Sequence, residues 1–222
     1  MIQHLIFDCD GVIVDSEILA SEITVEMLQP IGYQSTALEH AHRFAGLKET
    51  IIVERIRQED GVDVPEDFLH QVGEIFAKRF AAELKPIKGM PDLIRKVQLP
   101  KSVVSNSNLR SVISSTTRAG VREYFGRRIF SAEMVANPKP APDVYLLAVQ
   151  SIGIGPEDLL VIEDSLTGVE AAATAGLKVI GFAGAGHISP GHDARLRKVG
   201  ALDVAKDAQH LQQMLLALGV GF

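Results

Sequence analysis

Carboxylates and small polar residues directly follow three of the short apolar runs in the chain. These residues are Asp8, Asp10, Ser105, Asn106, Glu163 and Asp164. If the runs are parallel strands, their carboxyl ends share one edge of a sheet, where open α/β sheets bind ligands. Four carboxylates at one edge repel each other unless they hold a hard divalent cation, which prefers oxygen ligands. The spacing therefore predicts an acidic, cation-binding site at that edge.

The first group lies in the turn Asp8-Cys9-Asp10-Gly11. Two carboxyl groups two residues apart can share acid and base work, and Gly11 lets the chain turn sharply. A polar strand-to-loop turn has the same pattern without any chemistry, so this motif alone leaves both interpretations open. Ser105 and Asn106 leave a similar choice between anion binding at a helix start and simple helix capping.

The later motifs supply a cation and two further acids. Lys139 lies between Pro138 and Pro140, which restrict its backbone and help to aim its side chain, although an isolated lysine is usually solvated. Glu163 and Asp164 follow an apolar run directly. A solvated turn is the alternative there, but packing explains the pair poorly because a buried unpaired charge is costly.

Two kinds of apolar pattern in the sequence indicate the fold that positions these residues. Continuous apolar runs, typical of parallel strands buried on both faces, occur at 5–7, 102–104, 159–162 and 179–182. Helical patterns between them end at Gly120 and Gly176. Residues 16–86 carry helical spacing and no convincing strand. We expect an α/β sheet core from residues 1–15 and 87–222, with 16–86 as an inserted helical domain.

Composition restricts the partners and the compartment. Lys and Arg number 22 against 28 Asp and Glu, a net charge of −6, which disfavours a nucleic-acid surface. Cys9 is the single cysteine, which excludes an internal disulfide and agrees with a reducing cytoplasm. The apolar run at 5–7 is too short for a signal peptide or a membrane span. We expect a cytoplasmic protein without membrane partners, and nothing demands more than a monomer.

Taken together, the motifs resemble the haloacid dehalogenase-like superfamily, specifically its phosphatase and β-phosphoglucomutase-like branch. The resemblance rests on four motifs in the family's order: Asp8-Cys9-Asp10-Gly11 with Asp15-Ser16, then Ser105-Asn106, then Lys139-Pro140-Ala141-Pro142-Asp143, and Glu163-Asp164-Ser165. It implies a Rossmann-like core, and it implies that residues 16–86 form the cap domain of this branch.

The resemblance also implies a role for each motif residue. Asp8 would attack phosphorus and form an aspartyl-phosphate, which splits one hard displacement into two easier ones. Asp10 would protonate the leaving oxygen and then deprotonate water. Ser105, Asn106 and Lys139 would bind the phosphoryl group. Mg²⁺ would be held by residues of the first and last motifs: Asp8, the Asp10 backbone carbonyl, Asp164, and Glu163 directly or through water.

Among the reactions of this branch, hydrolysis of a small phosphorylated metabolite, such as a sugar phosphate, is the preferred prediction. Dehalogenases of the superfamily lack the second acid that Asp10 supplies. Mutases carry a His where this chain has Ala20 and an Arg where it has Glu49, although they share all four motifs. A non-catalytic binding protein on the same fold remains an alternative. A dinucleotide-binding enzyme would instead show a Gly-rich first turn.

Two other segments could take part in the function. Arg43, Gly46 and Lys48 follow a family pattern in which a cap loop meets the substrate, although solvated charges are an equal alternative. The run from Gly184 to His192 is rich in Gly and His. We interpret it as a flexible surface loop, which could border the active site, rather than as a transition-metal site.

Overall fold

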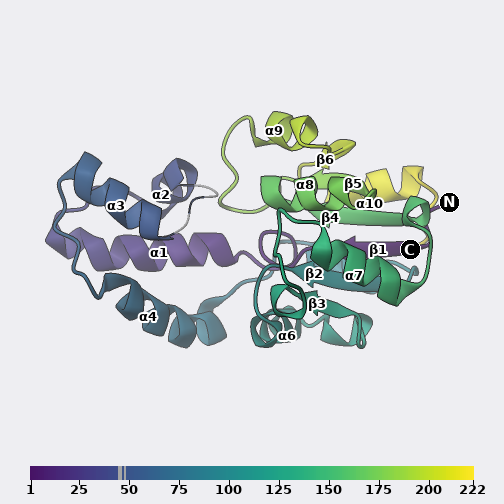
Figure 1. Ribbon diagram of the computed structural model, residues 1–222, viewed down its shortest axis with the longest axis horizontal. Coiled ribbons are helices and arrows are strands. Elements are labelled where there is room, and N and C mark those ends of the chain that lie inside the picture. The colour runs from purple at the N-terminus through teal and green to yellow at the C-terminus, as the bar shows by residue number, and fades with distance from the viewer. Residues whose placement is uncertain (45–46, 48) are drawn as a thin grey trace. The chain divides into compact units, whose positions relative to one another are not determined.

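The computed structural model describes residues 1–44, 47 and 49–222, which divide into two compact units. The sheet unit comprises Met1–Asp15, Lys85–Ala185 and Pro190–Phe222. The helical unit comprises Ser16–Leu84 and Gly186–Ser189. Figure 1 traces the elements of both units along the chain.

A six-stranded sheet organises the sheet unit, in the order β3-β2-β1-β4-β5-β6. Every neighbouring pair in this order is parallel. The strands are β1 (His4–Phe7), β2 (Lys101–Ser105), β3 (Ile129–Ser131), β4 (Leu159–Glu163), β5 (Lys178–Phe182) and β6 (Asp203–Ala205). The first strand of the chain therefore lies in the middle of the sheet, between β2 and β4. This confirms the predicted α/β class with a parallel sheet.

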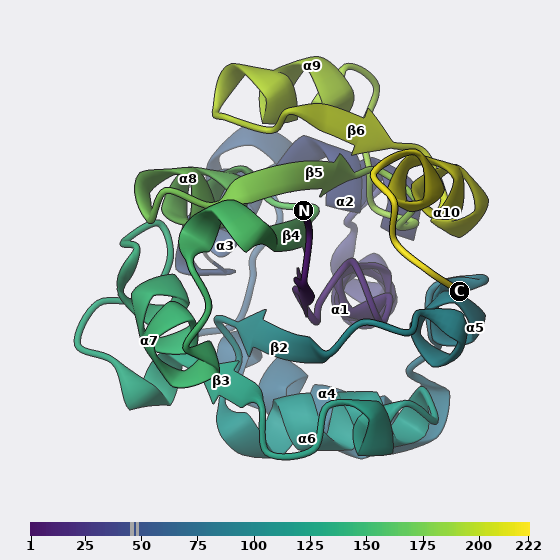
Figure 2. The ribbon, with the colours of Figure 1, turned by 90° about the vertical axis from the view of Figure 1, so that its right-hand side faces the viewer.

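Helices cover both faces of this sheet, as Figure 2 shows. One layer contains α7 (Asp143–Ile152), α8 (Leu166–Thr174) and α9 (His192–Lys198), which pack side by side. Across the sheet, α5 (Met90–Lys96) packs against α10 (Ala208–Ala217). The remaining helix of the unit, α6 (Leu109–Arg118), packs against β3.

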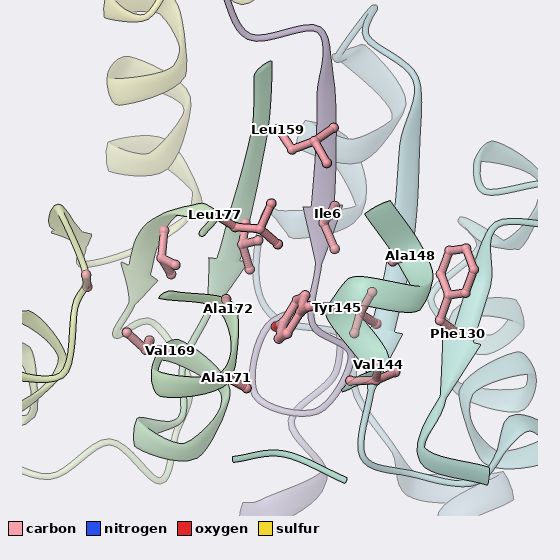
Figure 3. Packing of buried hydrophobic residues seen from close by; sticks show 14 of the residues in the cluster. Ile6, Phe130, Val144, Tyr145, Ala148, Leu159, Val169, Ala171, Ala172 and Leu177 are labelled. Atoms are coloured by element: carbon pink, nitrogen blue, oxygen red, sulfur yellow. The ribbon is translucent and has the colours of Figure 1, made fainter. Parts of the chain in front are cut away.

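The apolar core of the first layer lies between the sheet and α7, α8 and α9. Figure 3 shows Ile6 of β1, Tyr145 of α7 and Val169 of α8 within this cluster, and all three are fully buried. Strands with helices on both faces must be apolar on both faces, which explains why the central strands read as continuous apolar runs. The carboxyl ends of β1 and β4 therefore lie side by side in the middle of the sheet.

Two strands carry no clear sequence signal, and both lie at the edges of the sheet. β3 and β6 contain only three residues each, and β6 begins at the exposed Asp203. Short, partly polar edge strands are how proteins limit pairing with other chains. Local apolar patterning is weak in such segments, so the sequence did not predict them.

The described elements of the helical unit are all helices. They are α1 (Ser16–Leu28), the short 3-10 helix η1 (Gln29–Ile31), α2 (Ala37–Phe44), α3 (Glu49–Asp60) and α4 (Phe68–Glu83). They enclose a separate apolar cluster that includes Leu28, Phe44 and Ile56. Among the described residues of the whole chain, no helix combines the length and apolarity that crossing a membrane requires.

Candidate active site

Asp8 directly follows the carboxyl end of β1, which lies in the middle of the sheet. Its backbone N–H donates to the Ile162 carbonyl at 2.9 Å, which continues the pairing of β1 with β4. Glu163 and Asp164 follow on that neighbouring strand. The Asp8 side chain is only 8% exposed. The parallel pairing therefore brings together acids that lie more than half the chain apart in the sequence.

Gly11 permits this close approach. Its φ of +79° lies in the left-handed region that favours glycine. A Cβ added there would lie 1.9 Å from Oδ2 of Asp164, so any side chain would displace that carboxylate. The glycine after the second Asp is thus required by the neighbouring loop as well as by the turn.

A buried lysine joins the acids. The Lys139 ammonium donates to Oδ1 of Asp8 at 2.7 Å, to Oε2 of Glu163 at 2.7 Å, and to the Val104 carbonyl at 3.0 Å. Burial by itself disfavours the charged lysine, but Asp8 and Glu163 raise the pKa of Lys139 well above its usual value. Lys139 is therefore a fixed cation facing the Asp8 carboxylate.

The acids still outnumber that cation. Burial and the charge of Glu163 raise the pKa of Asp8 well above its usual range, with Lys139 opposing them. Asp8, Glu163 and Asp164 are all buried, and each can offer an oxygen within 4.8 Å of the others. An all-oxygen, net-negative donor set suits a hard divalent cation such as Mg²⁺. The residues present therefore fit the predicted metal.

Within this cluster, the protein itself holds both oxygens of Glu163. Oε2 accepts from Lys139 and from the Tyr145 hydroxyl at 2.8 Å, while Oε1 accepts from the Ser165 hydroxyl at 2.8 Å and the Ser165 N–H at 3.1 Å. Glu163 thus orients Lys139, and its role as a metal ligand stays a prediction. Sequence reasoning quoted Ser165 in a motif without giving it a role, and Tyr145 lies outside the four motifs, so neither contact was predicted.

Asp10 accepts hydrogen bonds from two hydroxyls of the β2 loop. Ser107 Oγ lies 2.7 Å from Oδ2 of Asp10, and Ser105 Oγ lies 3.3 Å from the same atom. The Ser107 N–H in turn donates to Ser105 Oγ at 3.0 Å. The predicted residue Ser105 is therefore beside Asp10, and Ser107, which directly follows the Ser105-Asn106 motif, is a further contact that sequence reasoning missed.

Asn106 holds the backbone of the Lys139 loop. Its Oδ1 accepts from the Lys139 N–H at 2.9 Å, and its Nδ2 donates to the Lys139 carbonyl at 3.1 Å. The residue that caps α6 is Asn108, whose Oδ1 accepts from the Ser111 N–H at 2.8 Å, so helix capping does not explain Ser105 or Asn106. Asn106 as a phosphate ligand stays a prediction, while its contact with Lys139 positions the cation.

The predicted substrate residues belong to the helical unit, and only one of them is described. Arg43 donates to both carboxylate oxygens of Asp60, at 2.9 and 2.8 Å, and to Glu59 at 2.7 Å. Gly46 and Lys48 lie outside the described residues. The guanidinium of Arg43 thus has carboxylate partners within its own unit, and a contact with substrate stays a prediction.

Comparison with known proteins gives consistent matches over most of the chain. Residues 5–182 match the family described as haloacid dehalogenase-like hydrolase. The 6-phosphogluconate phosphatase of Escherichia coli is 30% identical over 190 residues, which cover 85% of this chain and 86% of that protein.

Two solved structures agree over nearly the whole chain. A conserved haloacid dehalogenase-like protein of unknown function from Agrobacterium tumefaciens superposes with a TM-score of 0.91 at 32% identity, covering 99% of this chain and 100% of that one. A hydrolase from Deinococcus radiodurans, solved with bound phosphate and sodium, gives a TM-score of 0.87 at 29% identity, covering 98% and 96%.

Proposed function

The chain belongs to the haloacid dehalogenase-like hydrolase family, and we propose that it is a magnesium-dependent phosphatase acting on a small phosphorylated metabolite. The observation that carries the proposal is the buried lysine between Asp8 and Glu163, with Asp164 beside them. Such a cluster combines a carboxylate nucleophile with fixed positive charge, which is what phosphoryl transfer requires.

In the proposed first step, a carboxylate oxygen of Asp8 forms a bond to phosphorus while the bond from phosphorus to the substrate oxygen breaks. Asp10 donates its proton to that leaving oxygen, so the product is an alcohol and Asp8 carries the phosphoryl group. Lys139 offsets the negative charge at Asp8 and on the transferring group. Asn106 keeps the Lys139 backbone in place during this step.

In the second step, the Asp10 carboxylate takes a proton from water, and the water oxygen bonds to phosphorus. The bond to Asp8 breaks, which releases inorganic phosphate and regenerates the Asp8 carboxylate and the protonated Asp10. Asp8, the Asp10 backbone carbonyl and Asp164, with Glu163 nearby, would hold Mg²⁺. When bound, the ion supplies charge neutralisation that lets a phosphate approach this acidic edge.

The substrate is proposed to be a sugar phosphate or a phosphorylated sugar acid. The support is the 6-phosphogluconate phosphatase named among the relatives, together with the net charge of −6, which disfavours a nucleic-acid substrate. We propose a cytoplasmic monomer as its working form. A phosphosugar mutase is the second candidate, and Ala20 and Glu49 stand against it because mutases of this branch carry His and Arg there.

The test is phosphate release from a panel of sugar phosphates and phosphorylated sugar acids, with Mg²⁺ or with a chelator. Asp8→Asn is the inactive variant, and Asp92→Asn, which alters an exposed carboxylate on α5, is the matched control. We expect Mg²⁺-dependent release from the wild type and the control only. Isomerised sugar phosphate without free phosphate would indicate the mutase, and full activity of Asp8→Asn would overturn the mechanism.

A further inference from the structure

His192 begins helix α9, far along the chain from the four motifs, yet it contacts the acidic cluster. The residue is buried, with 9% of its surface exposed, and Nε2 lies 2.6 Å from the backbone carbonyl oxygen of Asp164. The histidine closes the loop of Gly184 to His192, which the sequence suggested to be a flexible surface segment. The structure instead gives its last residue a short, buried polar contact.

Two contacts of this imidazole indicate which ring nitrogen carries a hydrogen. A carbonyl oxygen only accepts, so Nε2 must carry the hydrogen that lies between it and Asp164. Arg195 only donates, and its Nη2 lies 3.4 Å from Nδ1 of His192, so Nδ1 must accept. Both contacts fit an imidazole that donates from Nε2 and accepts at Nδ1.

Packing alone does not require a polar donor at this position. Leu196, one turn further along α9, is fully buried in the core cluster and anchors the helix to the sheet. The His192 contact is directed at one backbone atom of Asp164, whose carboxylate also lies so close to Gly11 that a Cβ there would collide with it. The Asp164 main chain thus accepts a hydrogen bond from His192, while its carboxylate lies close to Gly11.

We propose that His192 is a positioning residue for the cation-binding cluster: its Nε2–H holds the Asp164 main chain so that the carboxylate points at the ion. The inference rests on the proposed role of Asp164 in holding Mg²⁺. Partners that orient metal ligands commonly change metal affinity by about 10- to 100-fold when they are removed. A donor acting on the ligand's main chain is expected at the lower end of that range.

The test measures divalent-cation binding directly, by Mn²⁺ electron paramagnetic resonance titration and by calorimetry with Mg²⁺, on the full chain without substrate. His192→Phe keeps a ring but removes the donor, whereas His192→Gln keeps an N–H near the place of Nε2. We expect His192→Phe to raise the dissociation constant about tenfold and His192→Gln to stay within about threefold of the wild type.

Two further variants separate the causes. Leu196→Val loosens α9 without touching the donor, so it should lower the melting temperature and leave metal affinity within about twofold. Asp164→Asn should weaken binding strongly. Wild-type affinity in His192→Phe, or equal losses in His192→Phe and His192→Gln, would overturn the inference while leaving the proposed function intact. Unchanged affinity in Asp164→Asn would instead refute the metal site and the inference together.

Discussion

Replacing Lys139 with Met removes the only buried cation seen in the described acidic cluster while keeping a side chain of similar length. Two unit charges 2.7 Å apart attract by about 6 kcal/mol at an effective dielectric constant of 20, and Lys139 makes two such contacts. Desolvation of the three charges offsets much of that gain. Breaking a buried pair from one side typically costs about 3–5 kcal/mol, because the remaining charge is left uncompensated.

We therefore expect Lys139→Met to lower the free energy of unfolding by about 3–5 kcal/mol, measured by urea denaturation at pH 7 with a chelator present. The double variant Lys139→Met/Glu163→Gln is the sharper measurement, since it removes one of the stranded carboxylates. Its loss should be smaller than the sum of the two single losses by about 2 kcal/mol. Phosphate release should fall about 10²- to 10³-fold in Lys139→Met.

Two results would contradict this reasoning. A loss of less than about 1 kcal/mol in Lys139→Met would mean that the ammonium does not compensate the buried acids. Single losses that add to within about 0.5 kcal/mol in the double variant would mean that Lys139 and Glu163 are not coupled.

Three further predictions follow from contacts of the sheet unit. Ser107→Ala should lower kcat about tenfold and leave KM within about twofold, because the acid/base carboxylate loses a charge-assisted hydrogen bond; steady-state phosphate release measures this, and an effect on KM alone would refute it. Gly11→Ala should destabilise the protein by more than the roughly 1–2 kcal/mol expected for positive φ alone, because its Cβ meets Asp164; Gly126→Ala, at φ +56° in open space, is the urea-denaturation control, and equal losses would refute the claim. Burial lowers the pKa of His4 to about 4 from its ordinary 6.5, with Arg128 and Lys101 adding to the effect, so the unfolded chain binds the extra proton and stability falls as pH drops from 6.5 to 4. From pH 7 to pH 5 the wild type should lose about 2 kcal/mol relative to His4→Gln, and parallel pH curves for the two proteins would contradict this.

The central strands and the motif residues could be predicted because their signals are local. An apolar run followed at once by Asp8, or by Glu163 and Asp164, predicts both a strand and polar residues at its carboxyl end. The side-chain partners could not be predicted in the same way. Asn106 and Lys139 meet across 33 positions, and nothing in either motif specifies that the amide clamps the lysine backbone.

The same limit applies to Tyr145 and His192. Neither residue carries a sequence signal for its contact, because Tyr145 bonds to Glu163 at the end of β4 and His192 bonds to Asp164 just after it. Tyr145 would register only as a core aromatic, since its hydroxyl finds Glu163 through the packing of α7 on the sheet. Pairing between distant elements is a tertiary property, so sequence patterns in a single chain carry little record of it.

The place of β1 in the sheet has a consequence for how the protein is made. Leu5 pairs with Lys101 on one side and with Leu160 on the other, so β1 is synthesised well before either of the strands that it pairs with. Until β4 has been synthesised, one edge of β1, the apolar strand that precedes the proposed nucleophile Asp8, has no strand to pair with. Contacts between residues so far apart in the sequence slow folding and prolong the exposure of aggregation-prone apolar surface. The helices of Ser16–Leu84 contact one another across shorter stretches of sequence, so they can form before β1 is paired.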